Sequence, residues 1–382
     1  MSDVTAPRPF VRTTLINPKS APRSSMGVFA RMRQRLFAGW LSAGLTIALL
    51  SLIFFTLPAL VRFLLIDAVW TGTDREACDP MKVGHAVGAC WPFISAKFAQ
   101  LICGFYPADQ RWRVTVVFAV AVALLAPLLA PALPYKRANM LAFFGVFPVL
   151  AVGLLRGGFF GLPYVETQLW GGLLVTLVIA VTGIVASLPL GIVLALGRRS
   201  PLPIVRILST VFIEFWRGVP LVTVLFFATY MLPLFLPNRW TVDALLRALI
   251  GVVLFSAAYM AEVVRGGLQA IPRAQFESAM ALGLGYWQMT GLVILPQALR
   301  LVIPGIVNTF IGLFKDTTLV LIVAIFDFLG QLRAAFADPN WATPTTLFTG
   351  FAFAGFVYFC FCFAMSRYSQ FIERRIEVGR QR

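Results

Sequence analysis

Long apolar runs dominate the chain and are separated by short polar segments. A helix that crosses the hydrocarbon of a bilayer needs about 20 consecutive apolar residues, and the chain contains several runs of that length. Many of them include proline, which membrane helices tolerate because neighbouring helices satisfy the freed backbone groups. We therefore expect about eight transmembrane helices, near residues 40–65, 114–134, 139–156, 168–196, 206–236, 243–264, 297–326 and 345–370.

The composition indicates an all-α polytopic membrane protein. Hydrophobic residues make up 59% of the 382 residues and charged residues 13%, with a mean hydropathy of +0.84; soluble domains carry about twice that share of charge. The single histidine, His85, and five cysteines without zinc-ligand spacing argue against a metal site or a histidine-based catalytic centre. No GxxxxGK[ST] loop occurs, so we expect no ATP binding through a P-loop, no metal and no cofactor.

Two polar segments lie outside the apolar runs. Residues 1–39 are basic and rich in Pro, Ser and Thr, which is typical of a disordered tail, although an organellar transit peptide has a similar composition. Residues 66–113 carry charges of both signs and contain Cys78 and Cys90. In an oxidising compartment these two cysteines could form a disulfide that stabilises by about 3 kcal/mol. Two free thiols are equally compatible with the sequence.

The net charge of +16 becomes an orientation signal once it is placed along the chain. With a cytoplasmic N-terminus and eight spans, 20 of the 32 Lys and Arg residues fall on the cytoplasmic side, 10 fall outside and two lie within spans. The inside loops would be 135–138, 197–205 and 265–296. Because Lys and Arg concentrate in cytoplasmic loops, we expect both termini in the cytoplasm and no nucleic-acid partner.

The inside loop at 265–296 is too structured in pattern to be a simple connector. Phe276, Met280 and Leu284 recur at helical spacing and predict an apolar stripe, while Gly283 and Gly285 predict a break in the helix. A short helix of this kind, projecting from a membrane domain, is suited to docking into a groove of a soluble partner.

The same loop resembles the EAA loop of ABC importer permeases. Glu277-Ser278-Ala279, Gly283 and Val293-x-Leu295-Pro296 match the spacing of the signature EAA---G---------I-LP, with two conservative replacements. Other motifs resemble the polar amino acid (histidine/glutamine/arginine type) branch of the family. They are Gly171-Gly-Leu-Leu-Val-Thr-Leu, Glu214-Phe-Trp-Arg-Gly-Val-Pro220, Tyr259-Met-Ala-Glu-Val-Val-Arg-Gly-Gly-Leu268 and Asn308-Thr-Phe-Ile-Gly-Leu-Phe-Lys-Asp-Thr-Thr-Leu319. The preceding part, with Gly88-Ala-Cys-Trp91, looks most like the M subunit of bacterial general L-amino acid permeases.

The resemblance implies a domain plan. A type I importer core of five helices would occupy 165–375 and include the coupling loop at about 265–296. An extension of three transmembrane helices would occupy 40–164, with a periplasmic loop at about 66–113. Cytoplasmic tails would occupy 1–39 and 376–382. The residues that couple to the ATPase would be Phe276, Glu277, Ser278, Ala279, Met280, Gly283 and Leu284.

The resemblance also implies partners and a mechanism. A cytoplasmic ABC ATPase dimer would hydrolyse ATP, so this chain would be a channel-forming subunit in the bacterial inner membrane rather than an enzyme. A second, homologous permease subunit would complete the channel, and a periplasmic amino acid-binding protein would deliver the substrate. ATP-driven closure of the ATPase dimer would be converted into alternating access.

Charged and polar residues inside the expected spans are candidates for function because they are costly in hydrocarbon. Glu214 and Arg217 lie three residues apart, which favours a structural ion pair, with a role in subunit contact or gating as the alternative. A second group shares nearly one helix face and is the candidate substrate pathway: Asn308, Thr309, Gly312, Lys315 and Asp316. The carboxylate of Asp316 could hold an α-ammonium group, or pair with Lys315 or another subunit.

A secondary amino acid transporter driven by an ion gradient is the main alternative function, because it also explains eight spans and charges within them. Such a transporter would not need the EAA-type loop and would tend to show inverted repeats, which we do not find. A membrane enzyme would need a cluster of catalytic residues at one interface, and a channel would need a selectivity ring.

Overall fold

The chain folds into helices joined by short connections. The computed structural model describes residues 27, 32–33, 36–130, 133, 135–158, 161–235, 237 and 242–381, with side chains described through Arg375. In this part of the chain no β-strand forms, and only isolated β-bridges are present. Two compact units result, residues 1–67 and 68–382. The predicted tail at 1–39 lies almost entirely outside the described residues, while the backbone of the predicted tail at 376–382 continues a helix as far as Gln381.

The first unit contains one long helix, made of α2 (Trp40–Val61) and its continuation η1 (Arg62–Ile66). Its 27 residues are long and apolar enough to cross a membrane, in agreement with the span predicted at 40–65. The hydroxyl of Thr56 donates a hydrogen bond to the carbonyl of Leu52 at 2.7 Å, which satisfies this polar group inside an apolar helix.

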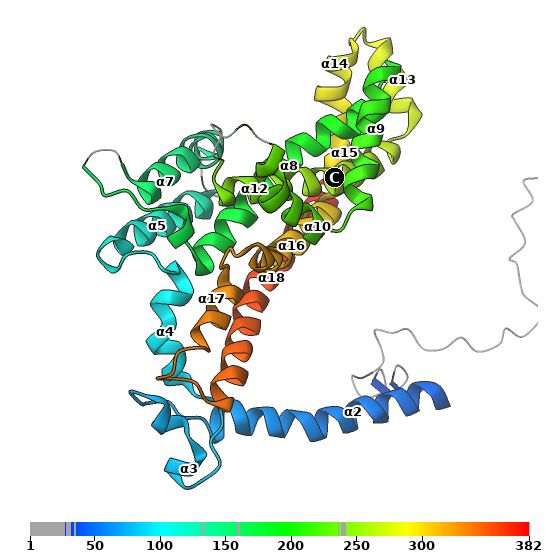
Figure 1. Ribbon diagram of the computed structural model, residues 1–382. Helices are drawn as coiled ribbons and strands as arrows, with labels where there is room; N and C mark the ends of the chain where they lie inside the picture. The colour runs from blue at the N-terminus through cyan, green and yellow to red at the C-terminus, as the bar shows by residue number, and fades with distance from the viewer. Residues whose placement is uncertain are drawn as a thin grey trace, which may run out of the picture. The chain divides into compact units, whose positions relative to one another are not determined.

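The second unit contains the remaining helices, which Figure 1 shows. Its short N-terminal elements and the first hairpin of long helices are η2 (Arg75–Cys78), α3 (Pro80–Val83), α4 (Trp91–Cys103), η3 (Ala108–Gln110), α5 (Arg111–Leu129), α6 (Lys136–Leu141), η4 (Ala142–Val146) and α7 (Phe147–Arg156). The rest are η5 (Thr167–Leu169), α8 (Gly172–Arg198), α9 (Pro203–Gly218), α10 (Leu221–Phe226), η6 (Phe227–Met231), α11 (Leu232–Phe235), α12 (Ala244–Gln269), α13 (Arg273–Ala281), α14 (Tyr286–Gln288), η7 (Met289–Ile294), α15 (Leu295–Leu301), α16 (Ile303–Asp316), η8 (Thr317–Val323), α17 (Phe328–Ala335) and α18 (Pro344–Gln381).

Seven helices among the described residues are long and apolar enough to cross a membrane. They are Trp40–Ile66, Ala108–Leu129, Lys136–Arg156, Gly172–Arg198, Ala244–Gln269, Ile303–Val323 and Pro344–Arg375. The straight span predicted at 206–236 is wrong in shape, because α9 and the segment Leu221–Phe235 meet at an angle of 102°. Pro220 explains the bend: the residue before a proline is pushed out of the helical region, and Val219 is extended, with φ −102° and ψ 133°.

The bent pair nevertheless carries the chain across the membrane once. Near the beginnings of α8 and α12, the hydroxyl of Thr167 donates a hydrogen bond to the carboxylate of Asp243. Near their ends, Arg198 contacts Glu262 at 2.7 Å. The two helices therefore run in the same direction, and the chain between them must return from one end to the other. With this crossing, the described residues supply the eight spans that the hydrophobic pattern predicts.

The segment expected as a polar loop at 66–113 is folded onto the bundle in its part from Ala68 onward. Cys78 and Cys90 form a disulfide, with their Cα atoms 5.7 Å apart. Both lie in a buried cluster with residues of α4 and α17, including Phe93 and Phe328. The amide of Cys90 donates to the hydroxyl of Thr349 on α18 at 2.8 Å. Figure 1 shows α3 and α4 at the end of the second unit opposite to α13 and α14.

Two glycines allow α4 to approach the beginning of α8. Gly172 has φ +64°, and a Cβ at this position would lie 2.2 Å from the carbonyl oxygen of Leu101. Its amide donates to the carbonyl of Phe326 at 2.9 Å. Gly104, with φ +68°, packs in the same way on the backbone of Gly171. A side chain at either glycine would clash with backbone atoms, and positive φ disfavours other residues.

A buried group of hydrogen-bonded polar residues joins α8, α17 and α18 near this end. Asp327 is fully buried and caps α17 by accepting a hydrogen bond from the amide of Gly330 at 2.9 Å. The hydroxyl of Tyr358 donates to the other oxygen of the carboxylate at 3.1 Å, and the hydroxyl of Thr176 accepts from the amide of Phe328. Burial raises the pKa of Asp327, and the hydrogen bonds oppose that rise.

The ion pair between Lys97 and Asp338 connects α4 to the turn before α18, and it is expected to make stability depend on pH. The hydrogen bond from Lys97, aided by the amide of Asn340, lowers the pKa of Asp338 below its ordinary value. The pair therefore stabilises fully above about pH 4, the unfolded value, and its contribution is lost as the pH falls through the lowered folded-state pKa.

The Asp338→Asn variant should remove this contribution, about 1 kcal/mol or less for a partly exposed pair, near neutral pH but not at strongly acidic pH. The measurement is the free energy of unfolding of the detergent-solubilised protein at both pH values. An equal loss at both would show that the pair does not act through the charge of Asp338.

Candidate functional site

The loop after α12 forms a helical hairpin. The helix α13 has nine residues and begins after Pro272. It ends because Gly283 adopts φ +73°, where the chain reverses. The amides of Leu282 and Gly283 donate to the carbonyls of Ser278 and Met280, at 3.2 and 2.9 Å. No atom lies within 4 Å of where a Cβ of Gly283 would be, so its backbone conformation and not lack of space calls for glycine.

Hydrogen bonds of side-chain amides hold the returning segment of the hairpin in place. Gln288 accepts a hydrogen bond from the amide of Gly285 and so caps α14. Gln297, on α15, donates to the side-chain oxygen of Gln275 on α13 at 3.2 Å and to the carbonyl of Val293 at 2.9 Å. These contacts make the loop a defined element rather than a flexible connector.

The predicted apolar stripe of Phe276, Met280 and Leu284 does not form one docking face. Phe276 and Leu284 are partly buried and pack against the core cluster around Leu268 and Met289, whereas Met280 is 57% exposed. Periodicity fails because α13 ends at Ala281, so Leu284 lies beyond the turn and off the helix. The alanine of the motif, Ala279, is buried in the same cluster and anchors the loop, whereas Glu277, Ser278 and Gly283 are exposed.

The exposed apolar surface of the loop instead comprises Met280, Leu282 and Trp287, the last two exposed by 80% and 75%. Glu277 and Arg273 are exposed on the same short helix. Periodicity could not find Leu282 and Trp287, because they flank the glycine turn. The sequence signal that indicates them is the presence of large apolar residues on both sides of such a turn.

Arg199, at the end of α8, connects the hairpin to the bundle. Its guanidinium donates to the carbonyl of Leu268 at 2.9 Å, at the end of α12. It also lies over the ring of Phe276, 5.7 Å from the centroid, within the range of a cation–π contact. A displacement of α13 would therefore act directly on the ends of both long helices.

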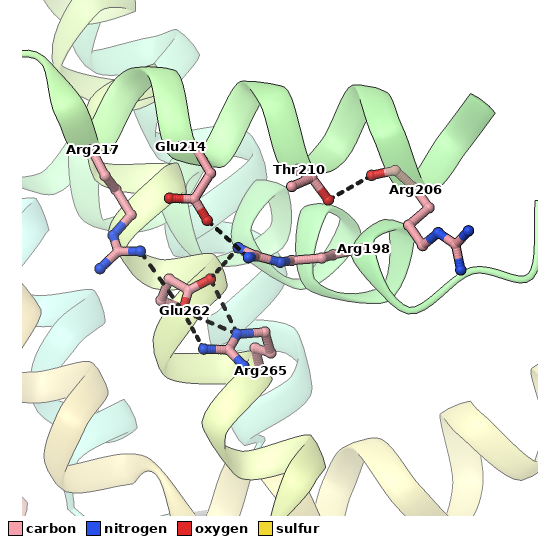
Figure 2. Close-up of polar contacts among 7 residues, drawn as sticks. All are labelled: Arg198, Arg206, Thr210, Glu214, Arg217, Glu262 and Arg265. Atoms are coloured by element: carbon pink, nitrogen blue, oxygen red, sulfur yellow. Dashed lines mark hydrogen bonds and ion pairs between the residues drawn. The ribbon is translucent and has the colours of Figure 1, made fainter. Parts of the chain in front are cut away.

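A cluster of five charged residues lies near the same helix ends, and Figure 2 shows it. Glu262 on α12 is its centre. Its carboxylate contacts Arg265 at 2.6 Å, Arg198 at 2.7 Å and Arg217 at 3.8 Å. Arg198 also contacts Glu214 at 2.8 Å. The side chain of Glu262 is 16% exposed and that of Glu214 is 54% exposed, so the central contacts are the better shielded ones.

The predicted ion pair between Glu214 and Arg217 is not present. Both residues lie on α9, but each pairs with another helix: Glu214 with Arg198 of α8, and Arg217 with Glu262 of α12. Tertiary packing of the three helices brings opposite charges closer than the spacing along α9 does. Arg217 also lies over the ring of Tyr259, 5.7 Å from its centroid.

The polar residues predicted for a substrate pathway lie along α16. Asn308, Lys315 and Asp316 are exposed, and a Cβ at Gly312 would meet no atom within 4 Å. The hydroxyl of Thr309 is bonded to the carbonyl of Gly305 in its own helix. Among the described residues, neither Lys315 nor Asp316 has an ion-pair partner. The face is open in the single chain.

Comparison with known proteins agrees with the geometry of the loop. Residues 187–378 match the family described as the binding-protein-dependent transport system inner membrane component. The chain is 48% identical over 363 residues to the inner membrane amino-acid ABC transporter permease protein YhdY of Escherichia coli (strain K12), covering 95% of this chain and 97% of that protein. The chain belongs to this family of ABC transporter permeases.

Two further relatives describe the extent of the permease. This chain is 40% identical over 428 residues to the glutamate/glutamine/aspartate/asparagine transport system permease protein BztC of Rhodobacter capsulatus, covering 96% of this chain and 98% of that protein. The glutamate/aspartate import permease protein GltK of Escherichia coli O6:H1 is 35% identical over 219 residues, which are 56% of this chain but 94% of that protein. A shorter family member thus corresponds to little more than half of this multi-pass permease.

The stability of the permease should depend more on Glu262 than on Glu214. Replacing Glu262 by Gln leaves Arg198, Arg217 and Arg265 without their shared partner, and we expect a loss of about 2–4 kcal/mol in the free energy of unfolding. Replacing Glu214 by Gln removes a single ion pair, which is the more exposed one. This change should lower the free energy of unfolding by less than about 1 kcal/mol. Denaturant titration of both variants in detergent measures the difference; equal losses would contradict the central position of Glu262.

Proposed function

We propose that this chain is the transmembrane permease subunit of an ATP-driven importer that moves L-amino acids from the periplasm to the cytoplasm by alternating access. The observation that carries the proposal is the hydrogen-bonded hairpin after α12, with Met280, Leu282 and Trp287 exposed at its tip, in a member of the family of binding-protein-dependent transport components. The substrate class is supported by the names of relatives that match nearly the whole chain.

The hairpin would dock into a groove of a cytoplasmic ATPase dimer. Apolar side chains at its tip would fill the groove, and Glu277 and Arg273 would contact polar groups at the rim. The chain shows no P-loop, so ATP would be hydrolysed on that separate subunit. The coupling residues predicted from the motif would then have three different roles. Phe276, Ala279 and Leu284 would fix the loop to the bundle. Glu277, Ser278 and Met280 would face the partner, and Gly283 would make the turn.

Closure of the ATPase dimer would reach the spans through Arg199 and the charged cluster. A shift of α13 would move Phe276 and, through Arg199, the ends of α8 and α12. The cluster around Glu262 would make α8, α9 and α12 move together, since each contributes at least one of its charges. Interfaces of this kind switch between discrete arrangements rather than deforming gradually.

The open face of α16 would form half of the substrate pathway. Asn308, Thr309 and Gly312 would line it, with Asp316 as a partner for an α-ammonium group and Lys315 for an α-carboxylate. A second, homologous permease subunit would cover this face and supply the other half. The exposed state of Lys315 and Asp316 in the single chain supports this reading.

The membrane orientation completes the proposal. The hairpin and both termini would lie in the cytoplasm, as the distribution of Lys and Arg favours. The disulfide-linked segment around α3 and α4 would then face the oxidising periplasm, where a binding protein delivers the amino acid. This extension of the core supports the narrower assignment to an M-type subunit of general L-amino acid permeases.

Uptake of a labelled amino acid into vesicles tests the function. We expect uptake to require both ATP and a periplasmic binding protein, and to be unaffected when ion gradients are collapsed. Uptake that is driven by an ion gradient without ATP or a binding protein would overturn the proposal in favour of a secondary transporter.

A charge reversal tests the docking loop. Glu277→Lys should reduce ATP-driven uptake at least about tenfold and release the ATPase during co-purification, because the new positive charge opposes the basic or polar rim that Glu277 would contact. The matched control is Asp109→Lys, which reverses an exposed acid near α4 at the opposite end. Retention of the ATPase together with full uptake in Glu277→Lys would refute the docking role.

A further inference from the structure

The helix α9 joins α8 to the segment Leu221–Phe235. It begins at Pro203, a few residues after α8 ends at Arg198, and it is nearly perpendicular to the segment Leu221–Phe235 that follows it. Since α8 is a span, its end lies at a membrane surface. The helix α9 therefore starts at the level of that surface.

The charges decide which arm of the bent pair crosses the bilayer. The segment Leu221–Phe235 contains no charged residue, whereas α9 contains Arg206, Glu214 and Arg217. Charged groups are costly in hydrocarbon, so the uncharged arm is the one that lies within the bilayer. With that arm near the membrane normal, the 102° bend lays α9 close to the membrane plane.

The surface of α9 has three distinct sides. One side is buried in the protein through Ser209 and Ile213, and Ser209 fits against Gly197 of α8. A second side carries the charged residues Arg206, Glu214 and Arg217. The third side is apolar and exposed at helical spacing, and it consists of Ile204, Ile207, Leu208, Val211 and Phe215.

The charge around α9 is positive. Arg198, Arg199, Arg206, Arg217 and Arg265 gather at these helix ends against the carboxylates of Glu214 and Glu262 alone, an excess of three positive charges. Four of the five arginines contact a carboxylate or a carbonyl. Arg206 is exposed and has no side-chain partner among the described residues, and Figure 2 shows its guanidinium apart from the others.

We propose that α9 is an interfacial helix that binds anionic phospholipid, with its apolar side in the acyl boundary and Arg206 on the headgroup phosphate. An amphipathic helix that carries an apolar face and an unpaired cation at the membrane surface has the chemistry for this ligand. The excess of positive charge selects an anionic headgroup over a zwitterionic one. The ion cluster holds α9 in place, so the site is formed before the lipid arrives.

Lipid binding to the purified full-length chain tests the site. Native mass spectrometry with phosphatidylglycerol and with phosphatidylcholine measures the affinity for each lipid. We expect a preference for phosphatidylglycerol, and about fivefold weaker binding of it by Arg206→Gln, which corresponds to about 1 kcal/mol for one basic residue near the surface. The matched control is Arg333→Gln, an exposed arginine of α17, which should leave the affinity unchanged.

Equal binding of the two lipids, or an equal loss in both variants, would overturn the proposal. A second measurement identifies what covers the apolar side. A photo-crosslinking amino acid at Leu208 in native membranes should label phospholipid. Crosslinks to another permease subunit instead would show that α9 is a protein interface. Neither readout requires transport, so the result is independent of the proposed function.

Discussion

The close packing of α8 against α12 sets the geometry of the whole permease. Gly191 makes it possible, because a Cβ at this position would lie 2.8 Å from the side chain of Met260 and 3.0 Å from the amide of Ala261. Without a hydrophobic driving force between helices in lipid, such approach through small residues supplies the attraction. Since the two helices are parallel, the intervening chain must cross back. The charges of α9 and the 102° bend then place α9 at one surface and α10 within the bilayer.

Both ends of this helix pair are closed by polar contacts of different kinds. At one end, Glu262 gathers arginines from three helices, and Arg199 extends the network to the hairpin. At the other end, Gly104, Gly171 and Gly172 bring α4 against the beginning of α8 through backbone contacts, and the buried carboxylate of Asp327 joins α17 to α18 through hydrogen bonds. The first end is charged and partly exposed, and its ion pairs couple α8, α9 and α12 next to the hairpin. The second end is buried and tightly packed.

The N-terminal extension is more than an addition to the core. Its elements from Ala68 onward belong to the same compact unit as the core, and the disulfide segment packs on α17 and α18. The sequence motifs predict a boundary between the two at about residue 164, because the motifs that resemble the family begin there. Motif boundaries follow the shared part of a family, whereas packing follows apolar surface, and α4 covers surface of α8 and α17 that would otherwise be open.

The sequence by itself determined the membrane class, the number of spans and the position of the hairpin. These depend on local properties: the length of apolar runs that hydrocarbon requires, the proline and glycine positions that break helices, and the spacing of a short motif. Only the tertiary structure decided which charges pair, which side chains of the hairpin face outward, and that α9 turns away from its span. Those features depend on contacts between helices far apart in the chain, such as Arg198 with Glu262, and a one-dimensional pattern does not contain such distances.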